Sequence, residues 1–227
     1  MATASKRLTR KQIRQPDWFQ VTSAKALEFY EENQIKVLLG AAGIVVLLLA
    51  VWGWQVFKQG QDAAAAQEFT KAMSLYQSEK YREAISDFQK VQAYRWSHYS
   101  ALAHLYEANS YLAIKEFDKA ITAAQQFIAA TSANSLYRQM GLVALASSEE
   151  HKNECKQAVD RYSEAAKIKA AFRDRAILGK ARCSEQVGDT KSAVAAYKEY
   201  LNDNPDPALA VRLAELESQT AAQGAAK

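Results

Sequence analysis

The sequence is poor in the residues that interrupt helices. It contains three prolines and eight glycines in 227 residues. That scarcity argues against a β-sandwich or barrel, whose many turns need both residues, and favours helices. Its two cysteines, Cys155 and Cys183, are too few for a disulfide framework, and their spacing matches no zinc motif. We therefore expect an all-α protein.

The sequence also lacks a recognisable catalytic constellation. It has three histidines; His98 and His104 lie six residues apart, a poor spacing for two ligands on one helix face, and His151 falls at a predicted turn. There is no phosphate-binding loop, no glycine-rich dinucleotide turn and no nucleophile elbow. We therefore expect no enzymatic activity, no cofactor, no metal and no small-molecule substrate.

Charge of one sign is scarce outside the N-terminal tail. The chain carries a net charge of +4, and residues 1–36 hold seven basic and four acidic side chains, so +3 of the total lies there. The remaining chain is close to neutral. A nucleic-acid-binding domain needs a basic surface, so the main domain is not expected to bind nucleic acid.

One long hydrophobic run is present, at residues 37–57. It has no charged residue over 21 positions, about 30 Å as a helix, which matches the hydrocarbon core of a bilayer. The basic region before it is longer than that of a signal peptide, and no small-residue cleavage site follows it. The sequence predicts a single uncleaved membrane anchor.

The tail at residues 1–36 predicts the orientation of this anchor. Basic residues in a short flank hold that flank in the cytoplasm, which places the C-terminal domain on the other side. After Pro16 the pattern is that of a loosely amphipathic helix, which would lie in the membrane interface, dock on a partner or simply extend the span. Five basic residues of the tail would share a helix face and contact anionic lipid or ribosomal RNA, or only set the topology. These residues are Lys6, Arg7, Arg10, Lys11 and Arg14.

Residues 58–217 contain an internal repeat. Four marker alanines follow one another at intervals of 36, 38 and 35 residues, and each is preceded by a small residue twelve positions earlier. Two antiparallel helices approach closely when small residues meet at their crossing, and a single pair cannot bury its apolar face alone. We therefore expect stacked helical hairpins. The marker alanines are Ala84, Ala120, Ala158 and Ala193.

These repeats resemble the tetratricopeptide repeat, whose units span about 34 residues. The segments YEANSYLAIKEFDKAI and GKARCSEQVGDTKSAVAAYKEYLNDNP carry the resemblance best, whereas the third unit has Glu149 where a tyrosine is usual. The resemblance implies a right-handed α-solenoid of about four hairpins. Pro207 begins a capping helix, and residues 218–227 are expected to form a frayed tail. The cap would cover the open end with Leu209, Leu213 and Leu216.

The repeat frame predicts which residues face the inside of the solenoid. This inner face is apolar and holds two methionines, a composition suited to loosely specific binding of peptides, although neighbouring helices would bury it equally well. A clamp for a C-terminal carboxylate is not expected, because Phe69 and Leu105 occupy positions where basic residues are needed. The predicted inner-face residues are Phe69, Met73, Tyr76, Leu105, Asn109, Leu112, Met140 and Val143.

A second candidate surface lies at the junction after the first repeat. Tyrosine, tryptophan and arginine are common anchors of protein interfaces. The same residues would also serve in packing between repeats, so two interpretations stay open. The junction residues are Tyr94, Arg95, Trp96 and Tyr99.

Cys155 and Cys183 lie at similar distances, 15 and 13 residues, from a turn expected near residue 170. Across an antiparallel helix pair such positions face each other with an offset of a few ångströms. We predict a disulfide in an oxidising compartment; two buried free thiols are the alternative.

The order of basic tail, span and repeats resembles the ancillary SecYEG translocon subunit family of bacteria (the YfgM type). The opening KRLTRKQIRQPDWF also looks like other membrane-anchored bacterial tetratricopeptide proteins. The resemblance implies a protein of the bacterial inner membrane whose periplasmic domain meets nascent chains or chaperones at the SecYEG translocon. A scaffold of an envelope or cell-division complex, and a cytosol-facing adaptor of inverted topology, are the alternatives.

Overall fold

The structure is a computed structural model that describes residues 18–225, so the five basic residues predicted to contact lipid or RNA lie outside the described range. Every regular element from residue 18 to residue 225 is an α-helix. The helices are α1 (Trp18–Glu32), α2 (Gln34–Gln77), α3 (Tyr81–Gln92), α4 (His98–Ala113), α5 (Phe117–Ala129), α6 (Leu136–His151), α7 (Cys155–Lys167), α8 (Arg173–Gln186), α9 (Thr190–Asp203) and α10 (Pro207–Ala225).

The chain divides into two units, Met1–Phe57 and Lys58–Lys227. In the first unit, α1 ends one residue before α2 begins. Asn33 lies between them; its side-chain amide donates a hydrogen bond to the Phe29 carbonyl at 3.2 Å and its side-chain oxygen accepts one from Lys36 at 3.0 Å. The helix after Pro16 is therefore separate from the span and not its plain extension.

Helix α2 contains the candidate membrane span. It is 44 residues long, and of the helices in the described part of the chain it alone is long and apolar enough to cross a bilayer. The large apolar side chains from Leu38 to Phe57 are exposed; Leu47, Leu48 and Trp52 each expose more than 60% of their surface. The helix continues past residue 57, the predicted end of the membrane span, because residues 58–61 contain no proline and only one glycine.

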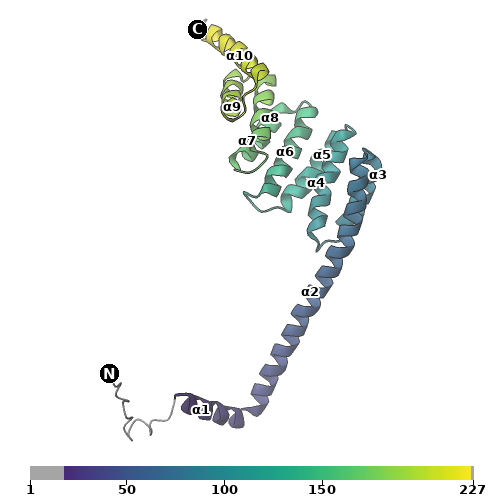
Figure 1. The fold of residues 1–227 in the computed structure, drawn as a ribbon, viewed down its shortest axis with the longest axis vertical. Coiled ribbons are helices and arrows are strands. Elements are labelled where there is room, and N and C mark those ends of the chain that lie inside the picture. Colours follow the sequence, from purple (N-terminus) through teal and green to yellow (C-terminus); the bar gives the residue numbers. More distant parts are fainter. Residues whose placement is uncertain (1–17, 226–227) are drawn as a thin grey trace, which may run out of the picture. The chain divides into compact units, whose positions relative to one another are not determined.

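The second unit is a stack of four helical hairpins and one capping helix (Figure 1). The last part of α2 pairs with α3, and the pairs α4–α5, α6–α7 and α8–α9 follow. The prediction of an all-α solenoid is confirmed. All eight alanines of the repeat frame have no exposed surface: Ala72, Ala84, Ala108, Ala120, Ala146, Ala158, Ala181 and Ala193.

The turns of the hairpins repeat with the same period as the alanines. One residue with positive φ lies five positions before each marker alanine, at Glu79, Lys115, Asn153 and Gly188, with φ of 60°, 62°, 66° and 80°. Only glycine adopts this left-handed conformation without cost. Three of the four hairpins therefore accept a strained residue, which the packing of the flanking helices offsets.

The crossing of α7 and α8 depends on Gly179. A Cβ at this position would overlap three ring atoms of Tyr162, which is 2% exposed and cannot move aside. We expect Gly179→Ala to lower the free energy of unfolding by about 2 kcal/mol, because overpacking exceeds the gain in helix propensity. Urea denaturation followed by circular dichroism measures it. Gly60→Ala, in open space on α2, is the control and should be slightly stabilising; equal behaviour of the two variants would contradict the prediction.

Helix α10 covers the open end of the stack. Leu209, Leu213 and Leu216 pack against α8 and α9, as the sequence predicts. The Asp206 carboxylate begins the helix by accepting hydrogen bonds from the amides of Ala208 and Leu209. The helix continues to Ala225, into the segment predicted to fray, because no helix-breaking residue precedes Gly224.

Candidate functional site

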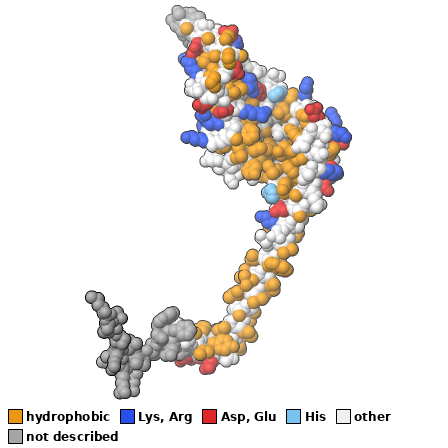
Figure 2. Space-filling view, in the orientation of Figure 1, with side chains coloured by type: hydrophobic (Ala, Val, Ile, Leu, Met, Phe, Trp, Pro, Cys, Tyr) orange, Lys and Arg blue, Asp and Glu red, His pale blue; other side chains and the backbone are white. Residues whose placement is uncertain are grey.

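Five of the predicted inner-face residues come together in one hollow. Helix α4 contributes Leu105, Asn109 and Leu112, and α6 contributes Met140 and Val143. The hollow has a volume of about 70 Å³, and Ala144 and Ser147 of α6 and Phe172 and Arg175 at the start of α8 also line it. Figure 2 shows hydrophobic side chains gathered on the surface over α4 and α6. The arrangement offers an apolar recess on the first helices of three consecutive repeats.

The other three inner-face residues belong to the core of the first repeat. Phe69 lies with its ring centroid 5.7 Å from Phe88 and 5.6 Å from Tyr106, and Tyr76 lies 5.5 Å from Tyr106. Met73 packs against the same cluster. Burial by neighbouring helices, the alternative considered for the whole inner face, describes these three partly buried residues. It also describes Leu105 and Val143, which are 2% and 4% exposed and belong to the core.

The junction residues are divided between core and surface. Tyr94 and Tyr99 pack against the first-repeat cluster, with the Tyr99 ring 5.3 Å from Phe69. Arg95 is exposed, and Trp96 exposes 55% of its surface. Ser97 is the N-cap of α4, where its hydroxyl accepts a hydrogen bond from the Tyr99 amide at 3.2 Å. The aromatic stretch therefore packs one repeat on the next and leaves only its middle at the surface.

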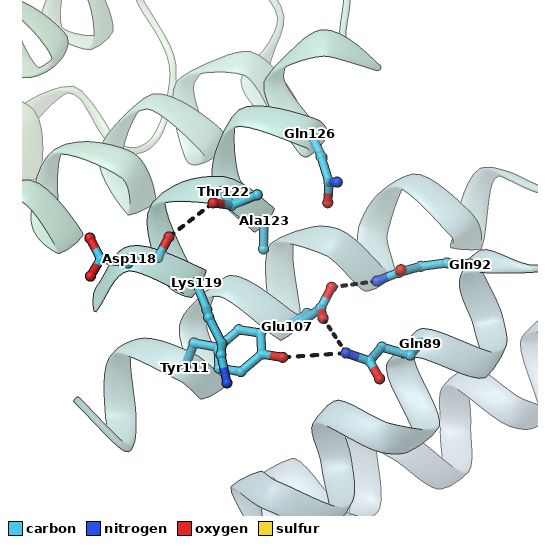
Figure 3. Close-up of a pocket in the computed structure, with 9 residues that line it drawn as sticks. All are labelled: Gln89, Gln92, Glu107, Tyr111, Asp118, Lys119, Thr122, Ala123 and Gln126. Atoms are coloured by element: carbon cyan, nitrogen blue, oxygen red, sulfur yellow. Dashed lines mark hydrogen bonds between the residues drawn. The ribbon is translucent and has the colours of Figure 1, made fainter. Parts of the chain in front are cut away.

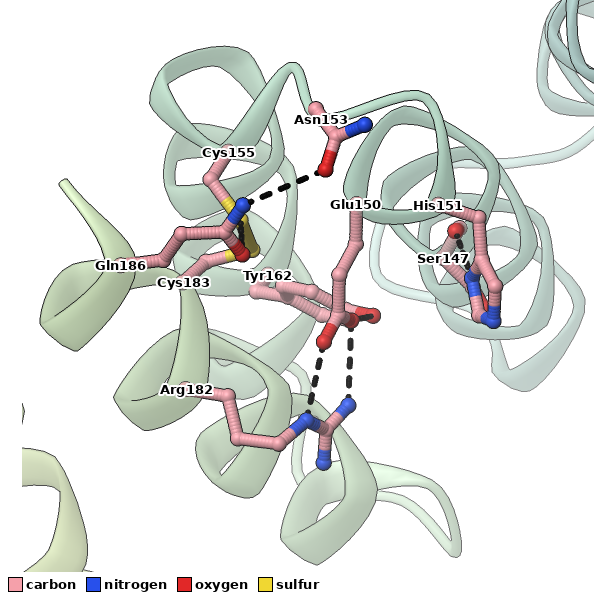
Figure 4. The surroundings of a disulfide bond; sticks show 9 residues. All are labelled: Ser147, Glu150, His151, Asn153, Cys155, Tyr162, Arg182, Cys183 and Gln186. Carbon is pink, nitrogen blue, oxygen red and sulfur yellow. Dashed lines mark hydrogen bonds and ion pairs between the residues drawn. A yellow bond between two sulfur atoms is a disulfide. The ribbon is translucent and has the colours of Figure 1, made fainter.

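Cys155 and Cys183 form a disulfide bond (Figure 4). Their Cα atoms are 4.9 Å apart, and both side chains are buried. Because Cys155 begins α7 and Cys183 lies in α8, the bond joins the second helix of the third repeat to the first helix of the fourth.

A buried tyrosine and an ion pair lie next to this disulfide (Figure 4). The Tyr162 hydroxyl donates a hydrogen bond to Glu150 at 2.6 Å, and Arg182 donates two to the same carboxylate at 2.9 and 3.0 Å. Burial raises the pKa of Tyr162. Burial also acts to raise the pKa of Glu150, but the hydrogen bonds from Arg182 and Tyr162 outweigh it and lower that pKa. The carboxylate is therefore ionised and fully engaged.

The same arrangement recurs 35 residues later. Tyr197 donates to Glu185 at 3.1 Å, and Arg212 of α10 donates to Glu185 at 3.0 Å. Burial raises the pKa of Tyr197 to about 12. The sequence interpretation missed these pairs, although their signal is present: a glutamate twelve residues before a tyrosine, in two consecutive repeats. Their consequence is that the glutamates and arginines at the C-terminal end of the solenoid neutralise each other.

A polar hollow of about 430 Å³ lies between α3, α4 and α5 (Figure 3). At its base Glu107 is 6% exposed and accepts hydrogen bonds from Gln89 at 2.8 Å and Gln92 at 2.5 Å. Burial acts to raise the pKa of Glu107, but His104, whose Nδ1 atom lies 3.7 Å from the carboxylate, and the hydrogen bonds from the two glutamines outweigh it and lower that pKa. Because the carboxylate is already satisfied, it serves to join α3 to α4. Within the described residues no group of three or more potential metal ligands occurs.

Glu149, the residue that departs from the repeat pattern, is a buried and poorly satisfied carboxylate. It is 5% exposed; Arg161 lies 3.8 Å away, and the Oε2 atom has no hydrogen-bond partner in the structure. Burial, only partly opposed by Arg161, raises its pKa. A raised pKa in the folded state means that the folded protein binds this proton more tightly than the unfolded chain does. The free energy of unfolding therefore falls as the pH rises and the Glu149 carboxyl group ionises.

We expect Glu149→Gln to stabilise the repeat domain by about 1 kcal/mol at pH 7, because it removes a buried charge without changing the side-chain shape. At pH 4, where the carboxyl group binds its proton, the two proteins should be nearly equal. Urea denaturation at both pH values tests this. A Gln variant less stable than the parent at pH 7 would show that the Arg161 pair is net stabilising.

Comparison with solved structures shows the fold to be tetratricopeptide-like. A chain described as MamA residues 41 to the end, from Desulfovibrio magneticus RS-1, matches with a TM-score of 0.53 and 15% identity over 63% of this chain and 78% of that one. A kinesin light chain from Podospora anserina with nearly identical TPR-like repeats matches with a TM-score of 0.58 and 14% identity, over 70% of this chain and 89% of that one. Protein-family models and curated protein sequences give no match.

The comparisons define a class of fold. This chain has a tetratricopeptide-like solenoid, and among the described residues its helix α2 is long and apolar enough to cross a membrane. At 14–15% identity the likeness concerns the fold alone.

Proposed function

We propose that this chain is a membrane-anchored adaptor that binds segments of other proteins on the inner face of its repeat domain. The observation that carries the proposal is the hollow between α4, α6 and α8, which five predicted inner-face residues line. Leu105 and Val143 are buried there, and Asn109, Leu112 and Met140 are partly exposed. An exposed apolar recess with few charges is typical of a protein-binding site. The chain would act through binding and not as an enzyme.

The proposed location is the inner membrane of a bacterium, with the tail in the cytoplasm and the repeats in the periplasm. The exposed apolar side chains of α2 support an anchor, and the basic tail supports this orientation. The disulfide between Cys155 and Cys183 supports an oxidising compartment, since such bonds are rare in the cytoplasm.

The proposed place of action is the protein-export machinery. The order of tail, span and repeats resembles the ancillary translocon subunits, and a loosely specific apolar recess suits emerging chains of varied sequence. The partners would be SecYEG, nascent secretory chains and periplasmic chaperones.

A topology experiment tests the location. A reporter that is active only outside the cytoplasm, fused after Lys227, should be active in cells. Activity confined to a cytoplasmic reporter fused at the same position would reject the periplasmic assignment and favour the inverted topology.

Site-specific photo-crosslinking tests the binding face. A photoreactive amino acid at Met140, in the hollow, should capture translocon subunits or nascent secretory chains in the native cell. The control is the same group at Gln125, which is exposed on α5. Equal capture from both positions would reject the inner face as the binding site. Capture of cell-wall or division proteins from Met140 alone would support the scaffold alternative.

A further inference from the structure

Arg175 differs from the other arginines of α8 and α10. Arg173 pairs with Glu199, Arg182 with Glu150, and Arg212 with Glu185 and Glu215. Arg175 has no ion pair or hydrogen bond among residues 18–225, although it lines the hollow described above. An unpaired cation on the wall of an apolar recess is available to a ligand, because no internal carboxylate neutralises it.

Acidic residues near the start of α8 and along the inner face are already engaged. Asp174 accepts a hydrogen bond from Asn204 at 3.2 Å, and Glu150 and Glu185 are held by arginine and tyrosine. The Arg175 side chain is exposed and lines the hollow.

The rest of the hollow determines what would accompany a carboxylate. Leu105, Leu112, Met140 and Val143 provide an apolar wall, and about 70 Å³ accommodates one small branched side chain. Asn109, which also lines the hollow, offers an amide that both donates and accepts hydrogen bonds and so suits the backbone of an extended chain.

We propose that this hollow binds an extended peptide segment in which a branched apolar residue is followed closely by aspartate or glutamate, with the apolar side chain in the recess and the carboxylate on Arg175. This inference rests on the proposed function and names its ligand class. A nucleic acid or a polyphosphate is disfavoured, because one isolated arginine in apolar surroundings lacks the cationic cluster that a polyanion requires.

Selection from a random twelve-residue peptide library against the full-length protein in detergent micelles tests the proposal. Parallel selections use the parent protein, Arg175→Glu and the control Lys191→Glu, which changes an exposed cation on α9. The parent and the control should enrich peptides that combine a branched apolar residue with an acidic one. Arg175→Glu should enrich basic peptides instead.

Affinities of individual peptides complete the test. A synthetic peptide from the parent selection should bind Arg175→Ala about tenfold more weakly, the usual effect of losing a charge-assisted hydrogen bond. Its Asp→Asn version should bind parent and variant alike. The enriched peptides could instead show no preference for acidic residues and yet lose their binding to the Leu112→Glu variant. That result would overturn this inference but would still support the inner face as the binding site. No enrichment by the parent protein would overturn the proposed function itself.

Discussion

Replacing Gln139 with leucine is expected to lower the free energy of unfolding by about 4 kcal/mol. The Gln139 side chain has no exposed surface and holds the loop between α7 and α8. Its amide donates hydrogen bonds to the carbonyls of Ala165 at 3.1 Å and Ile168 at 2.7 Å, and its oxygen accepts one from the Phe172 amide at 2.9 Å. Leucine would leave the Phe172 amide without a partner, at about 1–3 kcal/mol. It would also remove one of the two hydrogen bonds that each carbonyl accepts, at about 0.5–1.5 kcal/mol each, while the amides of Ile168 and Ala170 still donate to them.

Urea denaturation of the full-length protein in detergent measures this loss, and amide hydrogen exchange locates it. The Phe172 amide should exchange much faster in Gln139→Leu than in the parent. Gln125→Leu is the matched control, since Gln125 is exposed on α5, and it should change stability by less than about 0.5 kcal/mol. Unchanged protection of the Phe172 amide would show that the loop does not depend on this side chain.

Loss of the disulfide is expected to destabilise the repeat domain by about 3.5 kcal/mol. The bond closes a loop across a sequence separation of 28 residues, and its chief effect in the chain-entropy account is to restrict the unfolded chain. The double variant Cys155→Ala/Cys183→Ala should therefore unfold at lower urea concentration than the oxidised parent. The change should be largest in the third and fourth repeats, because stability in a solenoid depends on neighbouring repeats.

Reduction provides the internal control for this prediction. Dithiothreitol should lower the stability of the parent and leave the double alanine variant unchanged. Thiol labelling of unreduced, denatured protein should modify no cysteine. Full labelling without reduction, or equal stability of the parent with and without dithiothreitol, would contradict the bond.

Periodicity explains why so much of the fold was predictable. The intervals between Ala84, Ala120, Ala158 and Ala193 reappear in the spacing of the turns. Small residues are required wherever two helices cross closely, so the pattern depends on local geometry that the sequence displays. The positions of Cys155 and Cys183 relative to the expected turn followed from the same helix geometry.

The candidate site was predictable only in part. Leu105, Asn109, Leu112, Met140 and Val143 share the hollow because equivalent positions of adjacent repeats align. Phe69, Met73 and Tyr76 occupy equivalent positions in the first repeat but pack against Phe88, Tyr99 and Tyr106. The first repeat differs because Phe88, Tyr99 and Tyr106 of α3 and α4 place aromatic rings against these three side chains.

The sequence by itself determined the helical class, the single apolar run and the number of hairpins, since each depends on composition or on a period along the chain. Only the tertiary structure decided which side chains pair. Glu150 pairs with Arg182, 32 residues later, and Gln139 with Phe172, 33 residues later, because the stacking of adjacent repeats brings them together. Arg175 lines the hollow without such a partner in the described part of the chain. The chemistry of the inner face follows from those pairings, because a charge is available to a partner only where the fold leaves it unneutralised.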